Sequence, residues 1–352
     1  MQVEIATEAV PDLTLVQTCT KNPNHARFFK FNGFRMENIP EQWRRPEILE
    51  YIKNIGIRVV RLTVKPPDRE ARYGSGAVYK GLGFYFVLTN DHVVENQTDV
   101  VNCTVDFFYD SEDQSQVVTS KGVQLVACSG LHDKSVFTID TVPPKIMHIT
   151  KSDDIAPWVK VFATLEDKSI SESYGMLLKK WNEWYVWATV EESQRKPVVK
   201  CEIEFQAVKT ERVYSTDIDN TDKMVIIKLQ ESTLPQVIKE SSLLNTTAPW
   251  PRGNRDFIPV VIAHPHGGPK MISVGKLLAV EITDPVKPSF VYHTAETCPG
   301  SSGGLLITLG GDTLPYNGCA NTIGMHREGD SQEEFRGIPI ENKNLNLSMF
   351  QF

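Results

Sequence analysis

The segment 298–304, Cys-Pro-Gly-Ser-Ser-Gly-Gly, has the residue types of a loop that presents a serine nucleophile. A serine that attacks a carbonyl group must stand clear on a tight turn, and backbone N–H groups must converge on the oxygen that becomes negatively charged. Because glycine adopts backbone conformations that a side chain would block, we expect the N–H groups of Gly300 and Ser302 to form this oxyanion hole. The motif therefore predicts Ser302 as a nucleophile, and a glycine-rich hairpin that contains two serines is the alternative.

A histidine that could act as the general base follows an apolar run earlier in the chain. Residues 84–90, Phe-Tyr-Phe-Val-Leu-Thr-Asn, predict a strand, and His92 stands just beyond it. The preceding segment, Gly-Ser-Gly at 74–76, leads into another strand. With Gly-x-Ser-Gly-Gly downstream, these patterns resemble the trypsin/chymotrypsin superfamily from roughly residue 59 to residue 345, including its chain order of histidine, acid and serine. The resemblance implies that His92 accepts the proton of Ser302 during attack.

The resemblance also implies an aspartate just before an apolar strand, which accepts the ring N–H of His92 and stabilises the imidazolium. Asp222 precedes the apolar residues 224–229 and is the first candidate. The interval from His92 to Asp222 is far longer than in the superfamily, so we expect a large insertion over roughly residues 130–200. Three other aspartates compete for the role: Asp219, Asp217 and Asp133, the last at a more usual interval but before a less apolar run.

Three residues are candidates for the S1 pocket, which holds the substrate side chain before the scissile bond. Thr297, five residues before the serine, and His326, in Ile-Gly-Met-His, resemble the pair that binds P1 Gln or Glu in picornavirus 3C proteases and glutamyl endopeptidases. Glu296 occupies the place of the trypsin specificity aspartate, and would favour a basic P1 residue if it pointed inward. Because Gly-x-His also occurs in superfamily members that prefer aromatic P1 residues, the alternatives stay open, with Gln or Glu ranked first.

The cysteines and the N-terminal sequence indicate a compartment. The disulfide pairs of secreted trypsins are missing, since Val93 follows His92 where those enzymes carry a cysteine. No signal peptide is visible, and no run approaches the roughly 18 apolar residues of a membrane span. We expect reduced thiols in an intracellular, cytoplasmic protein with no membrane partner; a segment of a longer polyprotein is the rival interpretation. The six cysteines are Cys19, Cys103, Cys128, Cys201, Cys298 and Cys319.

No cofactor or metal is expected from the sequence. No cysteine–histidine cluster has the spacing of a zinc site, and the pair His264 and His266 has no third ligand nearby, which favours a structural turn. With a net charge of −7, the chain lacks the basic surface that nucleic-acid binding requires.

Ser301 replaces the aspartate that pairs with a newly cut N-terminus in digestive trypsins. We therefore expect control through self-association or a regulatory partner, and a protein or peptide as substrate.

The expected fold is mainly β, a chymotrypsin-like double six-stranded β-barrel. Its expected parts are an N-terminal extension (1–58) with one helix over 41–56, a first barrel (59–245) that includes the insertion, and a second barrel with a C-terminal tail (246–352). The resemblance implies a hydrolase of the trypsin-like class: a serine endopeptidase that cleaves peptide bonds through an acyl-enzyme, with the catalytic triad His92, Asp222 and Ser302. The alternatives are a catalytically silent protease-fold binding or scaffold module, and a viral or polyprotein processing protease.

Overall fold

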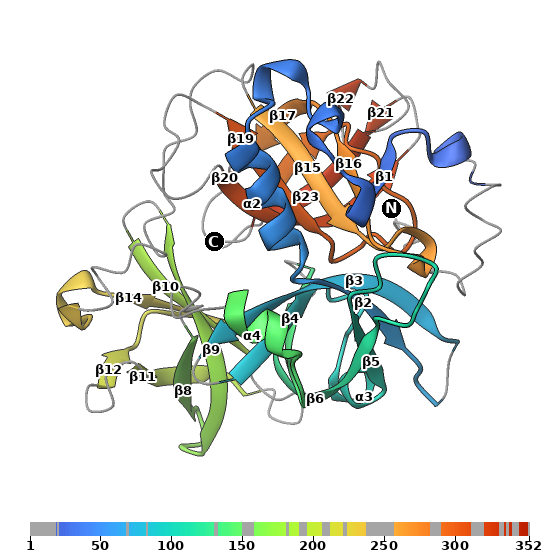
Figure 1. Cartoon of the computed structure of the whole chain (residues 1–352). Helices are drawn as coiled ribbons and strands as arrows, with labels where there is room; N and C mark the ends of the chain where they lie inside the picture. Colours follow the sequence, from blue (N-terminus) through green and yellow to red (C-terminus); the bar gives the residue numbers. More distant parts are fainter. Residues whose placement is uncertain are drawn as a thin grey trace.

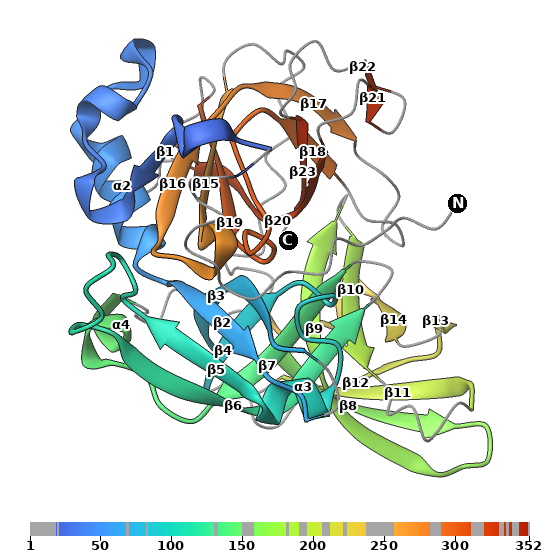
Figure 2. The same cartoon turned by 90° about the vertical axis from the view of Figure 1, so that its right-hand side faces the viewer.

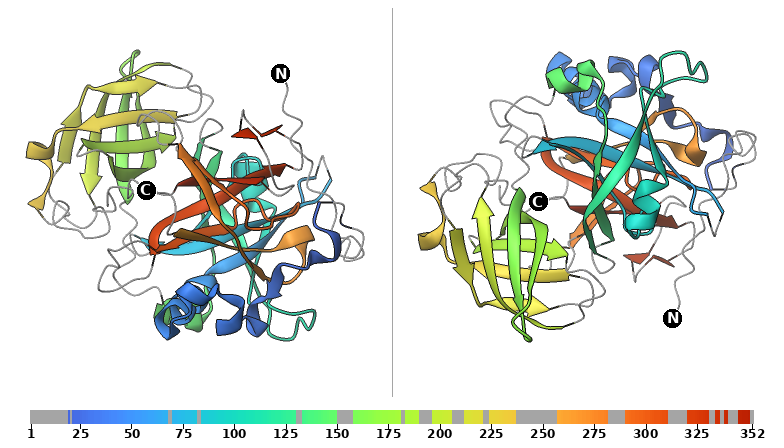
Figure 3. Two further views of the ribbon diagram at one scale, coloured as in Figure 1. Left: turned by 90° about the horizontal axis from the view of Figure 1, so that it is seen from above. Right: turned by 90° about the horizontal axis from the view of Figure 1, so that it is seen from below.

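Three large β units and an N-terminal helical extension make up the described part of the computed structural model (Figure 1). Figures 2 and 3 show the three units from other directions. The closed barrel contacts both of the other units. The structure describes residues 19, 21–67, 70–81, 84–129, 133–149, 158–180, 183–189, 196–205, 212–220, 224–236, 257–281, 290–310, 320–330, 334–335, 338–339 and 345–350.

The first unit is a closed six-stranded barrel, which confirms the expected mainly β fold class and its first barrel. Alternating side chains such as Val60, Leu62 and Val87 are fully buried in its interior, as the period of two in a strand requires. The short helix α3 (Gln97–Val101) lies beside the barrel strand β6 (Val118–Ser129). In barrel order the strands are β2 (Val59–Val64), β3 (Arg72–Gly81), β4 (Phe84–Thr89), β7 (Lys134–Ile139), β6 (Val118–Ser129) and β5 (Cys103–Phe107).

The second unit is an eight-stranded antiparallel sheet rather than the expected six-stranded barrel. The pairings among described residues do not join its two ends, and its edge strand comes from the N-terminal extension. In order the strands are β1 (Phe28–Lys30), β16 (Met271–Val274), β15 (Phe257–Ala263), β19 (Leu305–Gly310), β20 (Ala320–Asp330), β23 (Leu345–Phe350), β18 (Phe290–His293) and β17 (Leu277–Glu281). A small hairpin, β21 (Glu334–Phe335) and β22 (Ile338–Pro339), stands apart from this sheet.

The N-terminal extension covers one face of this sheet with helix α2 (Pro46–Gly56), which lies in front of β15 and β19 in Figure 1. Pro46 occupies the first turn, where its missing N–H costs nothing. Ile48 and Ile52, one turn apart, are fully buried against strand residues such as Ile262. Short turns precede the helix: η1 (Pro23–His25), η2 (Phe31–Gly33), η3 (Met36–Asn38) and η4 (Glu41–Trp43). The expected helix over 41–56 therefore begins five residues later, at the proline.

The third unit corrects the expected insertion. The six strands of the closed barrel end at Ile139, so the residues that follow are not inserted within it; they build a seven-stranded sheet with its own apolar core. Helix α4 (Pro144–Ile149) lies between barrel and sheet in sequence, and η6 (Glu231–Thr233) follows the sheet. In order its strands are β12 (Arg212–Ser215), β11 (Val198–Phe205), β8 (Trp158–Leu165), β9 (Ile170–Lys180), β10 (Glu183–Thr189), β14 (Met224–Leu229) and β13 (Ile218–Asn220).

No helix among the described residues is long and apolar enough to cross a membrane.

The buried face of α2 gives a test of this packing. Ile52 is fully buried, so Ile52→Ala removes apolar contacts and leaves a cavity under the helix. We expect a loss of about 2–5 kcal/mol in the stability of this unit, seen as a lower midpoint in urea unfolding. Glu50→Ala, on the exposed face of the same helix, serves as the control and should leave the midpoint nearly unchanged.

Candidate active site

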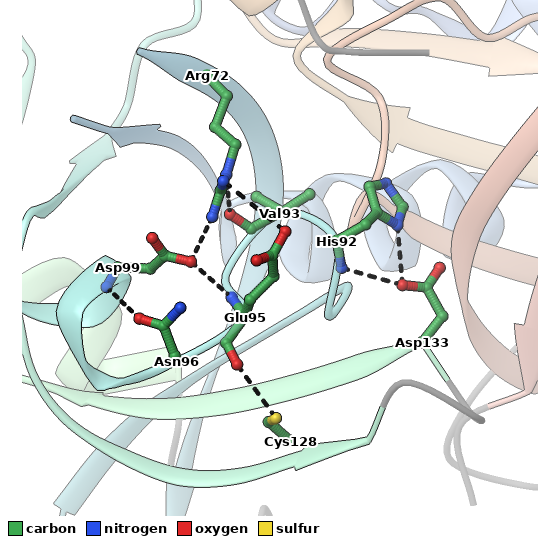
Figure 4. A network of polar contacts seen from close by, with 8 residues as sticks. All are labelled: Arg72, His92, Val93, Glu95, Asn96, Asp99, Cys128 and Asp133. Carbon is green, nitrogen blue, oxygen red and sulfur yellow. Dashed lines mark hydrogen bonds and ion pairs between the residues drawn. The ribbon is translucent and has the colours of Figure 1, made fainter. Parts of the chain in front are cut away.

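His92 and Asp133 form a hydrogen-bonded pair at one end of the closed barrel (Figure 4). The Nδ1 atom of His92 lies 2.8 Å from Oδ1 of Asp133, and the backbone N–H of His92 donates to the same oxygen at 3.2 Å. The Asp133 side chain is 7% exposed and that of His92 18% exposed. A carboxylate at Nδ1 requires the proton on that nitrogen. Nε2 is thereby left with the lone pair that a general base uses.

Asn90 holds the second oxygen of the carboxylate. Its Nδ2 donates to Oδ2 of Asp133 at 3.2 Å and to the Asp133 backbone carbonyl at 2.8 Å. Asp133 itself has a φ of 45°, a left-handed conformation that aspartate tolerates better than most residues, and it stands directly before β7. The strand end and the Asn90 amide together fix the direction in which the carboxylate points.

The carboxylate beside His92 is therefore Asp133 and not the first candidate from the sequence. Asp222 lies outside the described residues, but Asn220 ends β13 and Met224 begins β14, two strands of the seven-stranded sheet. The competitors Asp217 and Asp219 are exposed on that same sheet. The apolar run after Asp222 does form a buried strand, as expected, but in a unit other than the barrel that carries His92.

A second polar network braces the loop that follows His92 (Figure 4). Arg72, on β3, donates from Nε to the carbonyl of Val93 at 2.8 Å and forms an ion pair with the fully buried Asp99. Asp99 also accepts the backbone N–H of Glu95 at 2.9 Å. A buried carboxylate that meets a guanidinium and a backbone donor is well satisfied. The network thus fixes the exit of the histidine loop on the barrel.

The loop of Ser302 is a pair of tight turns with two glycines in the left-handed region. Gly300 has a φ of 86° and Gly303 a φ of 79°, conformations that side chains disfavour. The N–H of Ser301 donates to the Cys298 carbonyl at 2.9 Å, and the Ser301 hydroxyl accepts the N–H of Cys298 at 3.2 Å. The sequence prediction of a tight turn with glycine at position 300 is therefore confirmed, and Ser302 is 9% exposed.

Ser75 fastens this loop to the barrel. Its backbone N–H donates to the Ser302 carbonyl and its hydroxyl donates to the Gly300 carbonyl, both at 2.8 Å. The same hydroxyl accepts the N–H of His264 at 2.8 Å, so it also holds the turn η8 (Pro265–Gly267). With both carbonyls held by Ser75, the peptide planes of the loop have fixed orientations. The N–H of Gly300 donates to no residue within the described ranges, as an oxyanion donor requires.

The candidate S1 residues lie on the segment before the nucleophile. Thr297 is fully buried; its hydroxyl accepts a hydrogen bond from Nζ of Lys21 at 3.2 Å, and its carbonyl accepts one from Nδ2 of Asn22 at 2.7 Å. Glu296 is buried, with Nε of Arg27 3.8 Å from its carboxylate, and desolvation raises its pKa. The contacts of the N-terminal segment 21–27 with Thr297 and Glu296 had no signal in the sequence that we recognised.

His326 is placed only by its backbone. It lies on β20, where its neighbour Met325 pairs with Leu305, so the strand brings residue 326 level with the end of the nucleophile loop. Its side chain lies outside the described part of the structure.

No protein-family model and no curated protein matches this sequence. Among solved structures, the active form of the Rv3671c protease from M. tuberculosis is similar at 12% identity, with a TM-score of 0.40, over 87% of this chain and 82% of that one. The Deg5 structure matches at 12% identity and a TM-score of 0.38, over 88% and 90% of the two chains. An HtrA-type protease with a bound tripeptide matches at 12% identity and a TM-score of 0.35, over 85% and 58%. Similarity at this level carries no conclusion about function.

Gly303 offers a test of the loop geometry. A Cβ atom at this position would lie 2.0 Å from the Ser75 carbonyl oxygen and 2.3 Å from the Thr89 hydroxyl, neither of which can move without breaking the barrel contact. Since the left-handed backbone adds about 1–3 kcal/mol for a side-chain residue, we expect Gly303→Ala to lower the thermal unfolding midpoint. Gly33→Ala is the control, because a Cβ there meets nothing within 4 Å. Equal midpoints for the two variants would contradict the loop described above.

Proposed function

We propose that this protein is a serine endopeptidase whose triad is His92, Asp133 and Ser302. The observation that carries the proposal is the 2.8 Å contact between His92 Nδ1 and the Asp133 carboxylate, on the same barrel to which Ser75 fastens the Ser302 loop. A structural histidine needs neither a buried carboxylate at Nδ1 nor a glycine-rich serine loop held beside its strand. Together they supply a base, its orienting acid and a nucleophile in the chain order of the trypsin/chymotrypsin superfamily.

The proposed mechanism uses each of these contacts. The Ser302 Oγ attacks the carbonyl carbon of the scissile bond while Nε2 of His92 accepts the hydroxyl proton. Asp133 stabilises the imidazolium that results, and the N–H groups of Gly300 and Ser302 donate to the oxyanion. His92 then protonates the leaving amine, which departs and leaves the acyl-enzyme. A water molecule, deprotonated by His92, attacks the ester and releases the second product.

We also propose that the P1 residue is Glu or Gln. The Lys21 ammonium stands at the Thr297 hydroxyl, at the position that the superfamily resemblance assigns to the pocket wall. An ammonium and a hydroxyl bind a carboxylate or an amide oxygen, and disfavour a basic side chain. The carboxylate of Glu296, which a basic P1 residue would need, lies beside Arg27 instead. His326 would add a further donor if its ring reaches the same pocket.

The triad assignment predicts a difference between two aspartates. Asp133→Asn removes the acceptor that fixes the His92 tautomer, and we expect kcat to fall about 10⁴-fold. Asp222→Asn should leave kcat within a few-fold of the unmodified protein, because Asp133 already occupies the position at Nδ1 of His92. Both variants are assayed on a proteome-derived peptide library, with the new termini identified by mass spectrometry.

Ser302→Ala completes that comparison. Cuts made by the unmodified protein and lost in this variant establish the peptidase. Cuts that persist in this variant would contradict the assignment of Ser302 as the nucleophile. A folded unmodified protein that cuts nothing would favour the binding-module alternative.

The pocket assignment predicts the effect of removing one charge. We expect Lys21→Met to lower kcat/KM for P1 Glu about 10- to 100-fold, as the loss of a charge-assisted hydrogen bond does, and to lower that for P1 Gln less. Lys30→Met is the control, since Lys30 is 61% exposed and pairs with Glu112 on the surface. A P1 preference for Lys, Arg or Phe in the unmodified protein would overturn this pocket.

A further inference from the structure

Four metal-ligating side chains converge beside the nucleophile loop, from three segments far apart in the sequence. Cys19 and His25 come from the N-terminal segment, His266 from the η8 turn and Cys298 from the loop that leads to Ser302. All four are buried, and their potential ligand atoms lie within 4.8 Å of one another. None of them has a role in the proposed peptidase mechanism.

Three distances between ligand atoms of this cluster are close to the edges of a tetrahedron around zinc, and all its ligand atoms lie within 4.8 Å of one another. Zinc binds cysteine sulfur at about 2.3 Å and histidine nitrogen at about 2.0–2.1 Å, so the edges of its tetrahedron measure roughly 3.3 to 3.8 Å. The sulfur atoms of Cys19 and Cys298 lie 3.5 Å apart. Nε2 of His25 lies 3.4 Å from the Cys298 sulfur and 3.2 Å from Nε2 of His266. Two sulfurs and two imidazole nitrogens form a donor set that zinc prefers among the common divalent cations.

Hydrogen-bond donors point at both sulfurs of the cluster. The backbone N–H of Asn22 points at the Cys19 sulfur at 3.4 Å, and Nδ2 of Asn22 points at the Cys298 sulfur at 3.1 Å. One residue thus directs a donor at each sulfur. Donors of this kind stabilise and orient metal-bound ligands.

Both histidines stand in a strained backbone conformation. His25 has a φ of 48° and His266 a φ of 54°, in the left-handed region that costs a non-glycine residue about 1–3 kcal/mol. These conformations place the two rings parallel, with an angle of 7° between their planes and 5.1 Å between their centres. Strain at two partners of one cluster requires an interaction that holds both of them in place.

We propose that Cys19, His25, His266 and Cys298 form a structural zinc site that ties the N-terminal segment to the nucleophile loop. Zn²⁺ would bind two thiolates and two neutral imidazoles, and the two thiol protons would pass to solvent, so that the buried cluster is electrically neutral. All four positions are taken by protein, which marks a closed structural site rather than a catalytic one.

A metal in this site would hold two neighbouring segments in place, the η8 turn and the segment that contains Lys21 and Asn22. The His266 N–H donates to the Pro299 carbonyl at 2.5 Å, directly before Gly300. Lys21 and Asn22 lie between two of the ligands in sequence and contact Thr297. Metal at this position would therefore hold both the η8 turn behind the oxyanion loop and the segment that brings Lys21 to the pocket.

The experiment is a metal analysis of the full chain, purified without chelator and without a histidine tag. We expect one zinc per chain by inductively coupled plasma mass spectrometry. Cys19→Ala and His266→Ala should retain less than about a tenth of it. Cys201→Ala, a buried cysteine in the core of the seven-stranded sheet, is the matched control and should retain the full amount. Ser302→Ala should also retain it, so this result stands apart from the peptidase proposal.

A cobalt titration keeps the test independent of how the variants fold. Co²⁺ added to the metal-free unmodified chain should give thiolate-to-cobalt charge-transfer bands and the intense visible bands of a tetrahedral site, at one equivalent. Three results would overturn the proposal: a folded unmodified chain that neither carries zinc nor takes up cobalt, full zinc content in Cys19→Ala, or a Cys19–Cys298 disulfide found in the folded protein by peptide mapping.

Discussion

The hydrogen bonds from Ser75 to the loop of Ser302 are the constraint on which the candidate site depends. The residues of the proposed triad come from different units: His92 and Asp133 from the closed barrel, and Ser302 from the loop before β19 of the eight-stranded sheet. Two units packed only through apolar surfaces could slide, since such contacts are not directional. Ser75 removes that freedom, because its N–H and its hydroxyl bind two carbonyls of one turn. The close approach of Gly303 to the Ser75 carbonyl follows from the same contact.

The sequence predicted what local chemistry determines. The turn around Ser302, the strand before His92 and most of the helix predicted over 41–56 each depend on residues that are neighbours in the chain, such as glycine at a left-handed position or isoleucines one turn apart. The closed barrel was predicted for the same reason, because its strands follow one another in the sequence and every second residue of a strand such as β2 lies in the barrel core. What the sequence did not show was the number of units, since the apolar run after Asp222 fits a buried strand in any sheet.

The choice between Asp222 and Asp133 shows why the site was only partly predictable. An aspartate before a strongly apolar strand is a good pattern, yet the pattern says nothing about which sheet the strand joins. Asp133 precedes a run broken by Lys134 and Ser135, and these two polar residues are nevertheless buried. The deciding contacts are tertiary: the Asn90 amide on one carboxylate oxygen and two N–H groups of His92 on the other. Such contacts follow from strand order, which single-sequence periodicity does not encode.

The N-terminal segment is the largest departure from what the superfamily pattern implied. In the sequence it resembled a simple extension, whereas the structure gives it an edge strand, β1, and a place against the segment before the nucleophile. A short, largely irregular segment loses conformational entropy when it is held at one place. The hydrogen bonds of Lys21 and Asn22 to Thr297, together with a partly exposed ion pair of Arg27, compensate for only part of this entropy loss. A metal ion bound by Cys19 and His25 together with His266 and Cys298 would offset this loss of conformational entropy. One constraint would then order the pocket wall and the turn behind the oxyanion hole together.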